Sequence, residues 1–162
     1  MKKLALILFF LSLISNASFA QIEKKHFKEK VELETELGYL LYTPEDYKTS
    51  KKDYPLIVFL HGAGERGTDL DKVKMHGPFN YMEKGNKIDA VILAPQCPNE
   101  TYWQPHQVAG LVKSIIKKYN IDENRVYLTG LSMGGYGTWA VGGEYPELFA
   151  AMAPVCGAIY RP

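Results

Sequence analysis

The sequence predicts an α/β protein with a doubly wound, mostly parallel β-sheet and antiparallel edge strands near the N-terminus. Short apolar segments recur along the 162 residues, helical segments separate them, and a glycine-flanked serine follows one of them. Continuous apolar strands are typical of parallel sheets, because helices cover both faces. The composition, 46% hydrophobic and 23% charged, agrees with one globular core. A net charge of +1 without a basic stripe argues against nucleic-acid binding.

The first 20 residues are typical of a secretory signal peptide. Two lysines precede an apolar run over residues 4–14, and small residues precede a predicted cleavage site before Gln21. The apolar run is too short to span a bilayer. We therefore expect residues 1–20 to be removed and the mature chain to be extracytoplasmic, either periplasmic or secreted, without membrane association.

Two edge strands are expected next, followed by four buried ones. Residues 31–34 alternate between apolar and acidic side chains, and residues 38–43 form a second segment that stops at Pro44. These two segments are expected to pair as an antiparallel edge. The continuous apolar segments that predict buried parallel strands are 56–60, 90–94, 126–129 and 149–155.

Helical segments separate the buried strands. Apolar residues recur at spacings of three and four over 108–119, which predicts an amphipathic helix with lysines on its exposed face. Residues 71–84 predict a shorter, irregular helix broken near Gly77, and residues 136–141 begin another helix. Alternating strands and helices imply βαβ units with right-handed crossovers.

Residues 130–135, Gly-Leu-Ser-Met-Gly-Gly, match the G-x-S-x-G nucleophile elbow. The match lies between a predicted strand and a predicted helix, where a sharp turn exposes the serine hydroxyl above a helix N-terminus. A side chain at Gly130 or Gly134 would collide across so tight a turn. Ser132 is therefore the candidate catalytic nucleophile.

The loop at 61–67, after the first buried strand, fits two kinds of site. Its glycines satisfy the G-x-G-x-x-G dinucleotide fingerprint, but the required helix and the acidic residue ending the next strand are absent. The alternative is an oxyanion hole, in which two backbone amides bind the charged oxygen of a tetrahedral intermediate. We expect the amides of Met133 and Ala63 to form it, with Gly64 as the alternative to Ala63.

Neighbouring side chains have both structural and functional interpretations. His61 is better placed to brace the loop than to act as the base, because a base must hydrogen-bond the serine. Glu65 and Arg66 could bind a substrate or form a structural ion pair, and structural pairs are the commoner case. Trp103 and Tyr102 could line an acyl or aromatic pocket, or simply pack. No spacing of histidines and carboxylates suggests a metal site.

The sequence lacks two members of a catalytic triad. A nucleophilic serine needs a histidine base and an orienting carboxylate. In proteins with the G-x-S-x-G elbow, both residues follow the serine in the sequence. All four histidines precede Ser132, and no aspartate follows it.

The two cysteines, Cys97 and Cys156, follow strands that two other strands separate in the predicted sheet. At about 4.8 Å per strand step, a disulfide between them would need help from the loops. Export permits a disulfide, but two free buried thiols are the favoured expectation.

These motifs together resemble those of exported α/β-hydrolases. The resemblance is carried by residues 61–67, 94–98, 122–127, 130–135 and 145–149. The chain is similar in particular to the predicted-peptidase and phospholipase/carboxylesterase-like group, which is related to feruloyl esterases, polyhydroxybutyrate depolymerases and prolyl oligopeptidases. The resemblance covers residues 30–157. It implies a serine hydrolase without a cofactor, acting on small-molecule or polymer-linked esters.

The resemblance also implies that the chain is the N-terminal part of the fold. In this family further strands carry the triad acid and histidine, so both are expected beyond residue 162. Residues 21–162 are then a partial α/β-hydrolase domain. Three functions stay open: ester hydrolysis through an acyl-enzyme on Ser132, a catalytically incompetent fragment, and a prolyl-oligopeptidase-like peptidase.

Overall fold

The computed structural model describes residues 24–28 and 34–158, which fall in two units divided between Leu33 and Glu34. In the first unit, residues 24–28 are exposed and have no regular secondary structure. The predicted signal peptide lies outside the described residues, as do three residues of the strand predicted at 31–34. Glu34, the fourth of these residues, is in no strand. The second unit holds every helix and strand of the described residues.

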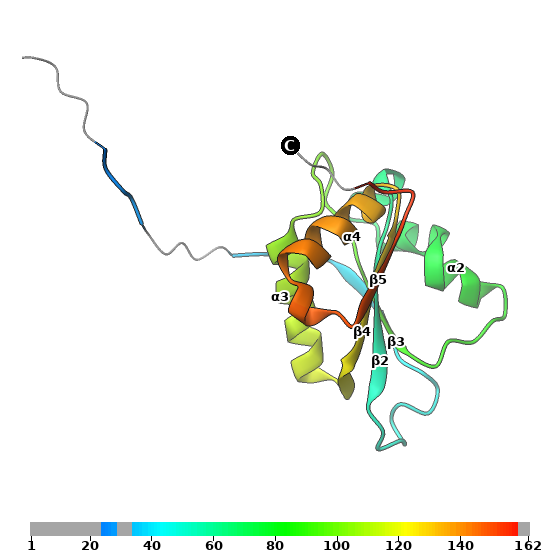
Figure 1. The fold of residues 1–162 in the computed structure, drawn as a ribbon. Coiled ribbons are helices and arrows are strands. Elements are labelled where there is room, and N and C mark those ends of the chain that lie inside the picture. The colour runs from blue at the N-terminus through cyan, green and yellow to red at the C-terminus, as the bar shows by residue number, and fades with distance from the viewer. Residues whose placement is uncertain (1–23, 29–33, 159–162) are drawn as a thin grey trace, which may run out of the picture. The chain divides into compact units, whose positions relative to one another are not determined.

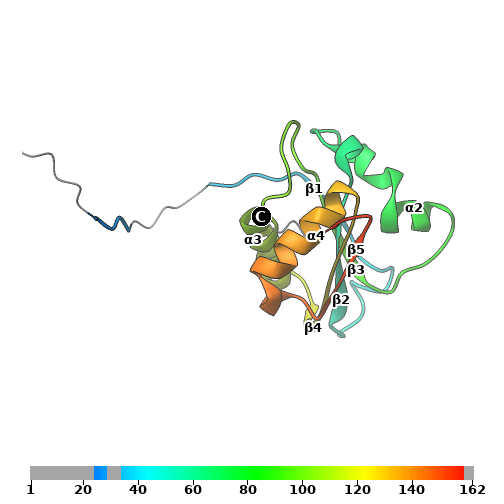
Figure 2. The same ribbon diagram turned by 45° about the horizontal axis from the view of Figure 1, so that its top comes forward.

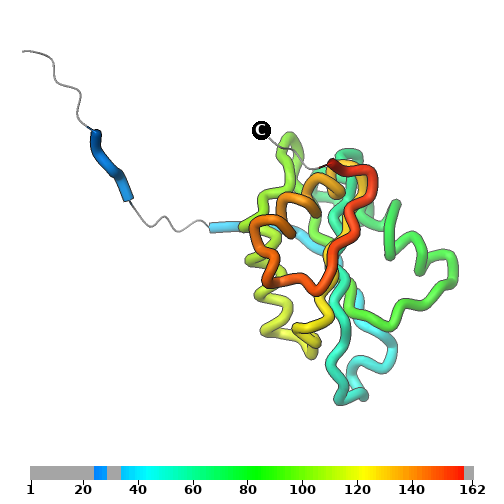
Figure 3. Tube along the Cα trace, in the orientation of Figure 1, coloured from blue at the N-terminus to red at the C-terminus, as the bar shows by residue number. Residues whose placement is uncertain are grey.

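The strands of the second unit are β1 Tyr39–Tyr42, β2 Tyr54–Leu60, β3 Val91–Pro95, β4 Ile121–Leu131 and β5 Ala151–Val155. They form one sheet in the order β1-β3-β2-β4-β5. The four strands from β2 to β5 are parallel, and β1 pairs antiparallel with β3 at one edge. The tube in Figure 3 follows the chain from β4 through the next helix to β5. The predicted mostly parallel sheet is confirmed.

Helices cover both faces of the sheet, as the sequence predicts. The helices α3 (Pro105–Lys118) and α4 (Met133–Glu144) lie on one face, and α2 (Gly77–Glu83) lies on the other (Figure 1, Figure 2). The irregular helix predicted over 71–84 is a 3-10 helix, η2 (Leu70–Met75), followed by α2. Two further 3-10 helices are η1 Ala63–Glu65 and η3 Pro146–Leu148.

Alternate residues of β2 pack into separate hydrophobic clusters. Leu56, Val58 and Leu60 belong to the larger cluster, which includes the buried stripe of α3. Phe59 belongs to a smaller cluster with Val73 of η2. Because successive side chains of a strand point to opposite faces, this alternation determines which face each helix covers.

The strand β4 is longer than the segment predicted at 126–129. It begins at Ile121, which pairs with Tyr54, and the register of the β2–β4 pair shifts between Tyr54 and Leu56. Residues 123–125 are exposed, so no apolar run marks this part of the strand in the sequence. The far end of β4 stops directly before Ser132.

Both edge strands differ from the sequence-based expectation. The sequence predicts that β1 pairs with the segment at 31–34, but the structure pairs it with β3. The sequence also predicts that β5 is buried on both faces, yet Met152 is 39% and Val155 47% exposed. The reason is position, because in the described sheet β5 is an edge strand with a neighbour on one side only.

The two cysteines are free, and β2 and β4 lie between the strands that they follow. Cys97 is buried, and burial raises the pKa of its thiol. Cys156 is exposed, so the expectation of two buried thiols is wrong for this residue. Its exposure follows from its place after the edge strand β5.

Candidate active site

Ser132 lies on a sharp turn between β4 and α4. Its backbone has φ 55° and ψ −113°, and the residue is exposed. A positive φ in a residue other than glycine costs on the order of 1–3 kcal/mol, so the surrounding structure must hold it. The Ser132 amide donates a hydrogen bond to the Val155 carbonyl at 2.9 Å, which ties the turn to the end of β5. This strained and exposed geometry is what the elbow motif predicts.

The glycines of the turn lie against backbone atoms. A methyl group on Gly134 would overlap the carbonyl oxygen of Leu60 and lie 2.5 Å from its carbonyl carbon. A methyl group on Gly130 would lie 2.5 Å from the carbonyl carbon of Gly134 and 2.8 Å from the Leu60 oxygen. Backbone atoms cannot move aside as a flexible side chain can. The steric reason for both glycines is therefore present in the structure.

The loop after β2 lies beside Ser132. It begins at His61 and continues into η1. A methyl group on Gly62 would lie 3.8 Å from Cβ of Ser132 and 3.6 Å from the carbonyl oxygen of Leu131. Gly62 therefore faces the turn, and the loop and the elbow meet at one place.

Three backbone amides at this junction are free to bind an anion. Within residues 24–28 and 34–158, the amides of Ala63, Gly64 and Met133 have no hydrogen-bond acceptor. Ala63 and Gly64 are exposed, and Met133 is the first residue of α4. The N-terminus of a helix carries a partial positive charge, which favours an anion beside Met133.

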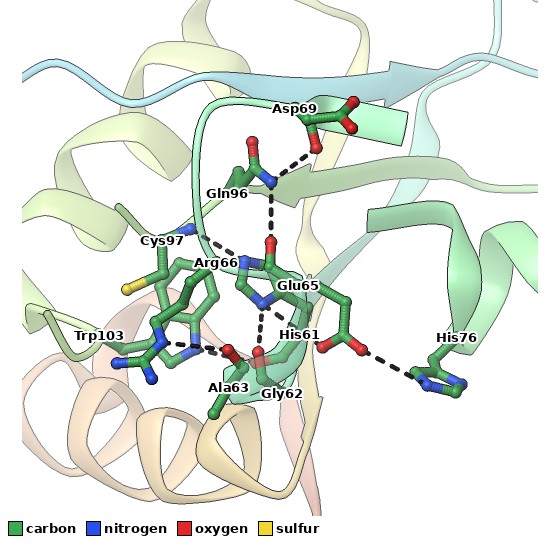
Figure 4. Close-up of polar contacts among 10 residues, drawn as sticks. All are labelled: His61, Gly62, Ala63, Glu65, Arg66, Asp69, His76, Gln96, Cys97 and Trp103. Atoms are coloured by element: carbon green, nitrogen blue, oxygen red, sulfur yellow. Dashed lines mark hydrogen bonds and ion pairs between the residues drawn. The ribbon is translucent and has the colours of Figure 1, made fainter. Parts of the chain in front are cut away.

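His61 is fully buried and joins the loop to the end of β3 (Figure 4). Its Nε2 accepts a hydrogen bond from the Cys97 amide at 2.9 Å, and its Nδ1 lies 2.6 Å from the Gly62 carbonyl oxygen. Because Nε2 accepts, Nδ1 carries the proton and donates to Gly62. Burial lowers the pKa of His61, so the ring is neutral at neutral pH. These contacts agree with a bracing role and occupy both ring nitrogens.

The side chain of Glu65, in the same loop, is buried and contacts two histidines (Figure 4). Its Oε2 lies 3.8 Å from Nδ1 of His61, and its Oε1 lies 3.4 Å from Nε2 of the half-exposed His76. Arg66 instead donates to the Ala63 carbonyl at 3.1 Å. In the described part of the chain, Glu65 thus forms structural contacts with histidines and no ion pair with Arg66.

Sequence reasoning missed two residues that hold this loop. Gln96 is buried, and its Nε2 donates to the carbonyls of Glu65 and Asp69 at 2.8 and 2.7 Å. A polar residue directly after β3 was a usable signal, because side chains there meet the neighbouring loops. His76 gave no such signal, since η2 separates it from Glu65 and no sequence periodicity relates the two.

A cavity of about 270 Å³ opens beside the first turns of α4. Its lining includes Met133, Tyr136 and Ala140 from α4, with Tyr102 and Trp103 from the segment before α3. Trp103 also packs, because its Nε1 donates to the His61 carbonyl at 3.2 Å. Trp103 therefore lines a cavity and also packs, and the binding of an acyl or aromatic group there stays a prediction. Because Met133 directly follows Ser132 in the sequence, the cavity begins next to the candidate nucleophile.

Three features are absent from the described ranges, 24–28 and 34–158: a histidine hydrogen-bonded to Ser132, a metal-binding cluster and a membrane-spanning helix. No histidine there hydrogen-bonds Ser132. No cluster of three His, Cys, Asp or Glu side chains there could hold a metal ion. Nor does this part of the chain contain a helix of the length and apolarity needed to cross a bilayer.

Several known proteins similar to this chain are named esterases or depolymerases, and one family model that matches is a peptidase family. Residues 100–160 match the prolyl oligopeptidase family. Poly(3-hydroxyalkanoate) depolymerase C of Paucimonas lemoignei is 39% identical over 118 residues, which is 66% of this chain and 28% of that protein. Feruloyl esterase B of Talaromyces stipitatus is 42% identical over 136 residues, 75% of this chain and 36% of that protein.

Solved structures agree with these matches. The crystal structure of a thermostable esterase is 39% identical, with a TM-score of 0.62 over 78% of this chain and 38% of that one. A feruloyl esterase module from Clostridium thermocellum is 17% identical with a TM-score of 0.59, covering 76% of this chain and 50% of that one, a likeness of fold alone. The chain spans less than half the length of the curated relatives that it matches.

Proposed function

Because the chain belongs to the esterase group of α/β-hydrolases, we propose that it contributes the nucleophile and the oxyanion hole of a serine esterase. The observation that carries this proposal is the geometry of Ser132. Ser132 is exposed on a strained turn, at the N-terminus of α4 and beside the loop that contains Gly62. A serine in such a position is suited to nucleophilic attack on a substrate carbonyl rather than to packing in the core.

The proposed reaction runs through an acyl-enzyme. Oγ of Ser132 gives its proton to a base and bonds to the ester carbonyl carbon, and the carbonyl oxygen becomes an oxyanion. The amides of Ala63 and Met133 bind that oxyanion, with Gly64 as the alternative to Ala63. Collapse of the intermediate breaks the bond to the alcohol oxygen, which leaves with the proton. Water then repeats the sequence and releases the acid. Each oxyanion donor stabilises the transition state by about 3 kcal/mol.

The base and its carboxylate partner are proposed to come from sequence beyond residue 162. Both nitrogens of His61 are occupied, and His76 contacts Glu65. The relatives are longer than this chain, which supports the same proposal. No cofactor or metal has a part in this mechanism. With the leader at 1–20 removed, the protein would act outside the cytoplasm.

The substrate is proposed to be a small-molecule or polymer-linked carboxylic ester. The names of the relatives support this breadth, since they include a poly(3-hydroxyalkanoate) depolymerase, feruloyl esterases and acetylxylan esterases. The cavity beside α4 is proposed to hold the acyl group, with Trp103 as one wall. Glu65, weakly suggested as a substrate contact by the sequence, is assigned no direct contact, because its side chain is buried.

A larger side chain in the cavity should raise KM for esters with large acyl groups but not for esters with small ones. Ala140→Phe adds a ring to an exposed position in the cavity lining. We expect KM for a cinnamoyl or octanoyl ester to rise about tenfold, equal to about 1.4 kcal/mol, and KM for an acetyl ester to change little. Glu144→Phe, at the other end of α4, is the control. Equal effects of Ala140→Phe on all acyl lengths would place the acyl group elsewhere.

A peptidase is the second candidate function. It is favoured by the match of residues 100–160 to the prolyl oligopeptidase family. The third, a catalytically incompetent chain, follows if no base reaches Ser132.

One assay on the protein secreted from the complete coding sequence distinguishes these candidates. The substrates are p-nitrophenyl acetate, a feruloyl ester and a prolyl peptide anilide, and a fluorophosphonate probe reports whether Ser132 is activated. Turnover of esters well above the anilide supports the esterase. Faster cleavage of the anilide supports the peptidase, and absence of both turnover and labelling supports the incompetent chain.

A further inference from the structure

We infer that His61 is a positioning residue that aims the Ala63 amide at the oxyanion by holding the carbonyl oxygen of Gly62. This inference rests on the proposed esterase function and deepens it. Bracing a loop could have many consequences, whereas this contact has a specific one. It determines the direction of a single N–H group that the proposed reaction uses.

The peptide bond between Gly62 and Ala63 couples the direction of a carbonyl to that of an amide. The carbonyl of Gly62 and the amide of Ala63 belong to the same peptide unit, which is planar and trans, so the C=O and the N–H point in opposite directions. Nδ1 of His61 lies 2.6 Å from the Gly62 oxygen. Holding this oxygen toward the buried ring turns the Ala63 N–H away from the ring. Within the described residues, that N–H has no acceptor.

The proton on Nδ1 is fixed from the other side of the ring. Nε2 accepts from the Cys97 amide at 2.9 Å, and an atom that accepts there cannot carry a proton. Glu65 Oε2, which is buried without a hydrogen-bond partner, lies 3.8 Å from Nδ1. An acceptor oxygen on this side favours the N–H at Nδ1. Both neighbours therefore select the tautomer that can donate to Gly62.

The ring itself is held against movement. Trp103 lies edge-on to it with 4.9 Å between the ring centroids, and its Nε1 donates to the His61 carbonyl. The loop beyond is fastened by Gln96, which donates to two of its carbonyls (Figure 4). The His61 ring, itself held in place, hydrogen-bonds the carbonyl of the Gly62–Ala63 peptide unit and so fixes the direction of its N–H. An oxyanion donor needs such a fixed direction before the reaction begins.

Two substitutions of His61 distinguish the contact made by Nδ1 from the contact made by Nε2. In His61→Asn, the side-chain amide can take the place of Nδ1 and donate to Gly62. In His61→Gln, the longer side chain can take the place of Nε2 and accept from Cys97, but it releases the Gly62 carbonyl. Asn removes more volume from this buried site than Gln does, so a smaller loss in His61→Asn than in His61→Gln would report the restored contact with Gly62 and not better packing. His106→Gln, exposed on α3, is the control.

We expect His61→Gln to lower kcat for p-nitrophenyl acetate by about 100-fold, the effect of losing one oxyanion donor, with KM changed less than threefold. His61→Asn should recover at least tenfold of that loss. Affinity for an arylboronic acid, which forms an anionic tetrahedral adduct with the serine, should fall in His61→Gln by the same factor as kcat. Equal losses in the two variants, or a loss that appears in KM, would overturn the inference.

A second measurement does not depend on activity or on the folding of a variant. Imidazole ¹⁵N NMR of the secreted wild-type protein should show His61 as the single Nδ1-protonated tautomer at neutral pH. Protonation at Nε2 would overturn the inference even if the enzyme is active. A wild-type protein that hydrolyses no ester, but shows the Nδ1 tautomer, would contradict the proposed function and leave the inferred direction of the amide supported.

Discussion

Ser132→Ala is expected to lower kcat for ester hydrolysis by roughly 10⁴- to 10⁶-fold, as loss of the nucleophile does in other serine hydrolases. The change removes one oxygen atom from an exposed residue, so it should leave the fold intact. The substitution keeps the oxyanion amides, and any rate that remains reports their contribution and that of binding alone. The measurement is the hydrolysis of p-nitrophenyl acetate by the secreted protein, together with labelling by a fluorophosphonate.

The control for this substitution is Ser114→Ala, which removes the same oxygen from a partly buried position on α3. It should keep both the activity and the labelling. Continued labelling of the Ser132→Ala protein would show that another residue is the nucleophile, and the proposed mechanism would then be wrong. A circular dichroism spectrum matching that of the wild type confirms that any loss is chemical.

The parts of the fold that the sequence predicts well are those where burial dictates residue type. The strands β2 and β3 are enclosed on both faces, so nearly every residue in them is apolar and the segments stand out. The start of β4 does not stand out, because residues 123–125 are exposed there. The exposure of β5 could not be predicted either. It depends on which strands neighbour it, and not on its own apolar residues.

The residues of the candidate site likewise fall into those that the sequence predicts and those that it does not. Ser132 and its glycines could be predicted because a tight turn excludes other residues at fixed spacings. The contact of Glu65 with His76 could not, because η2 lies between the two residues in the sequence and their side chains meet only in the folded chain. No local rule relates residues that are brought together by tertiary structure. The buried carboxylate of Glu65 was therefore indistinguishable in the sequence from an exposed one.

The helix α4 contains glycines that serve close packing and not helix stability. Each glycine inside a helix costs about 1 kcal/mol relative to alanine, so α4 is intrinsically weak. A methyl group on Gly137 would lie 2.6 Å from Cδ1 of Trp103, and one on Gly142 would lie 2.6 Å from Sδ of Met152. The weak helix is therefore held by contacts at short range. Those contacts bring its N-terminus, and with it Ser132, close to the ends of β2 and β5.

Gly134→Ala and Gly143→Ala are expected to change the stability in opposite directions, although both place a methyl group on α4. The methyl group at Gly134 would overlap the Leu60 carbonyl, which is backbone in the centre of the sheet and cannot yield, so we expect a loss of about 4 kcal/mol or more, or failure to fold. The methyl group at Gly143 meets nothing within 4 Å, so we expect a gain of about 0.5–1 kcal/mol from helix propensity. Urea denaturation of the two variants measures both effects. A Gly134→Ala protein as stable as the wild type would mean that α4 does not approach β2 as closely as this packing requires, and the strained position of Ser132 would lose its structural cause.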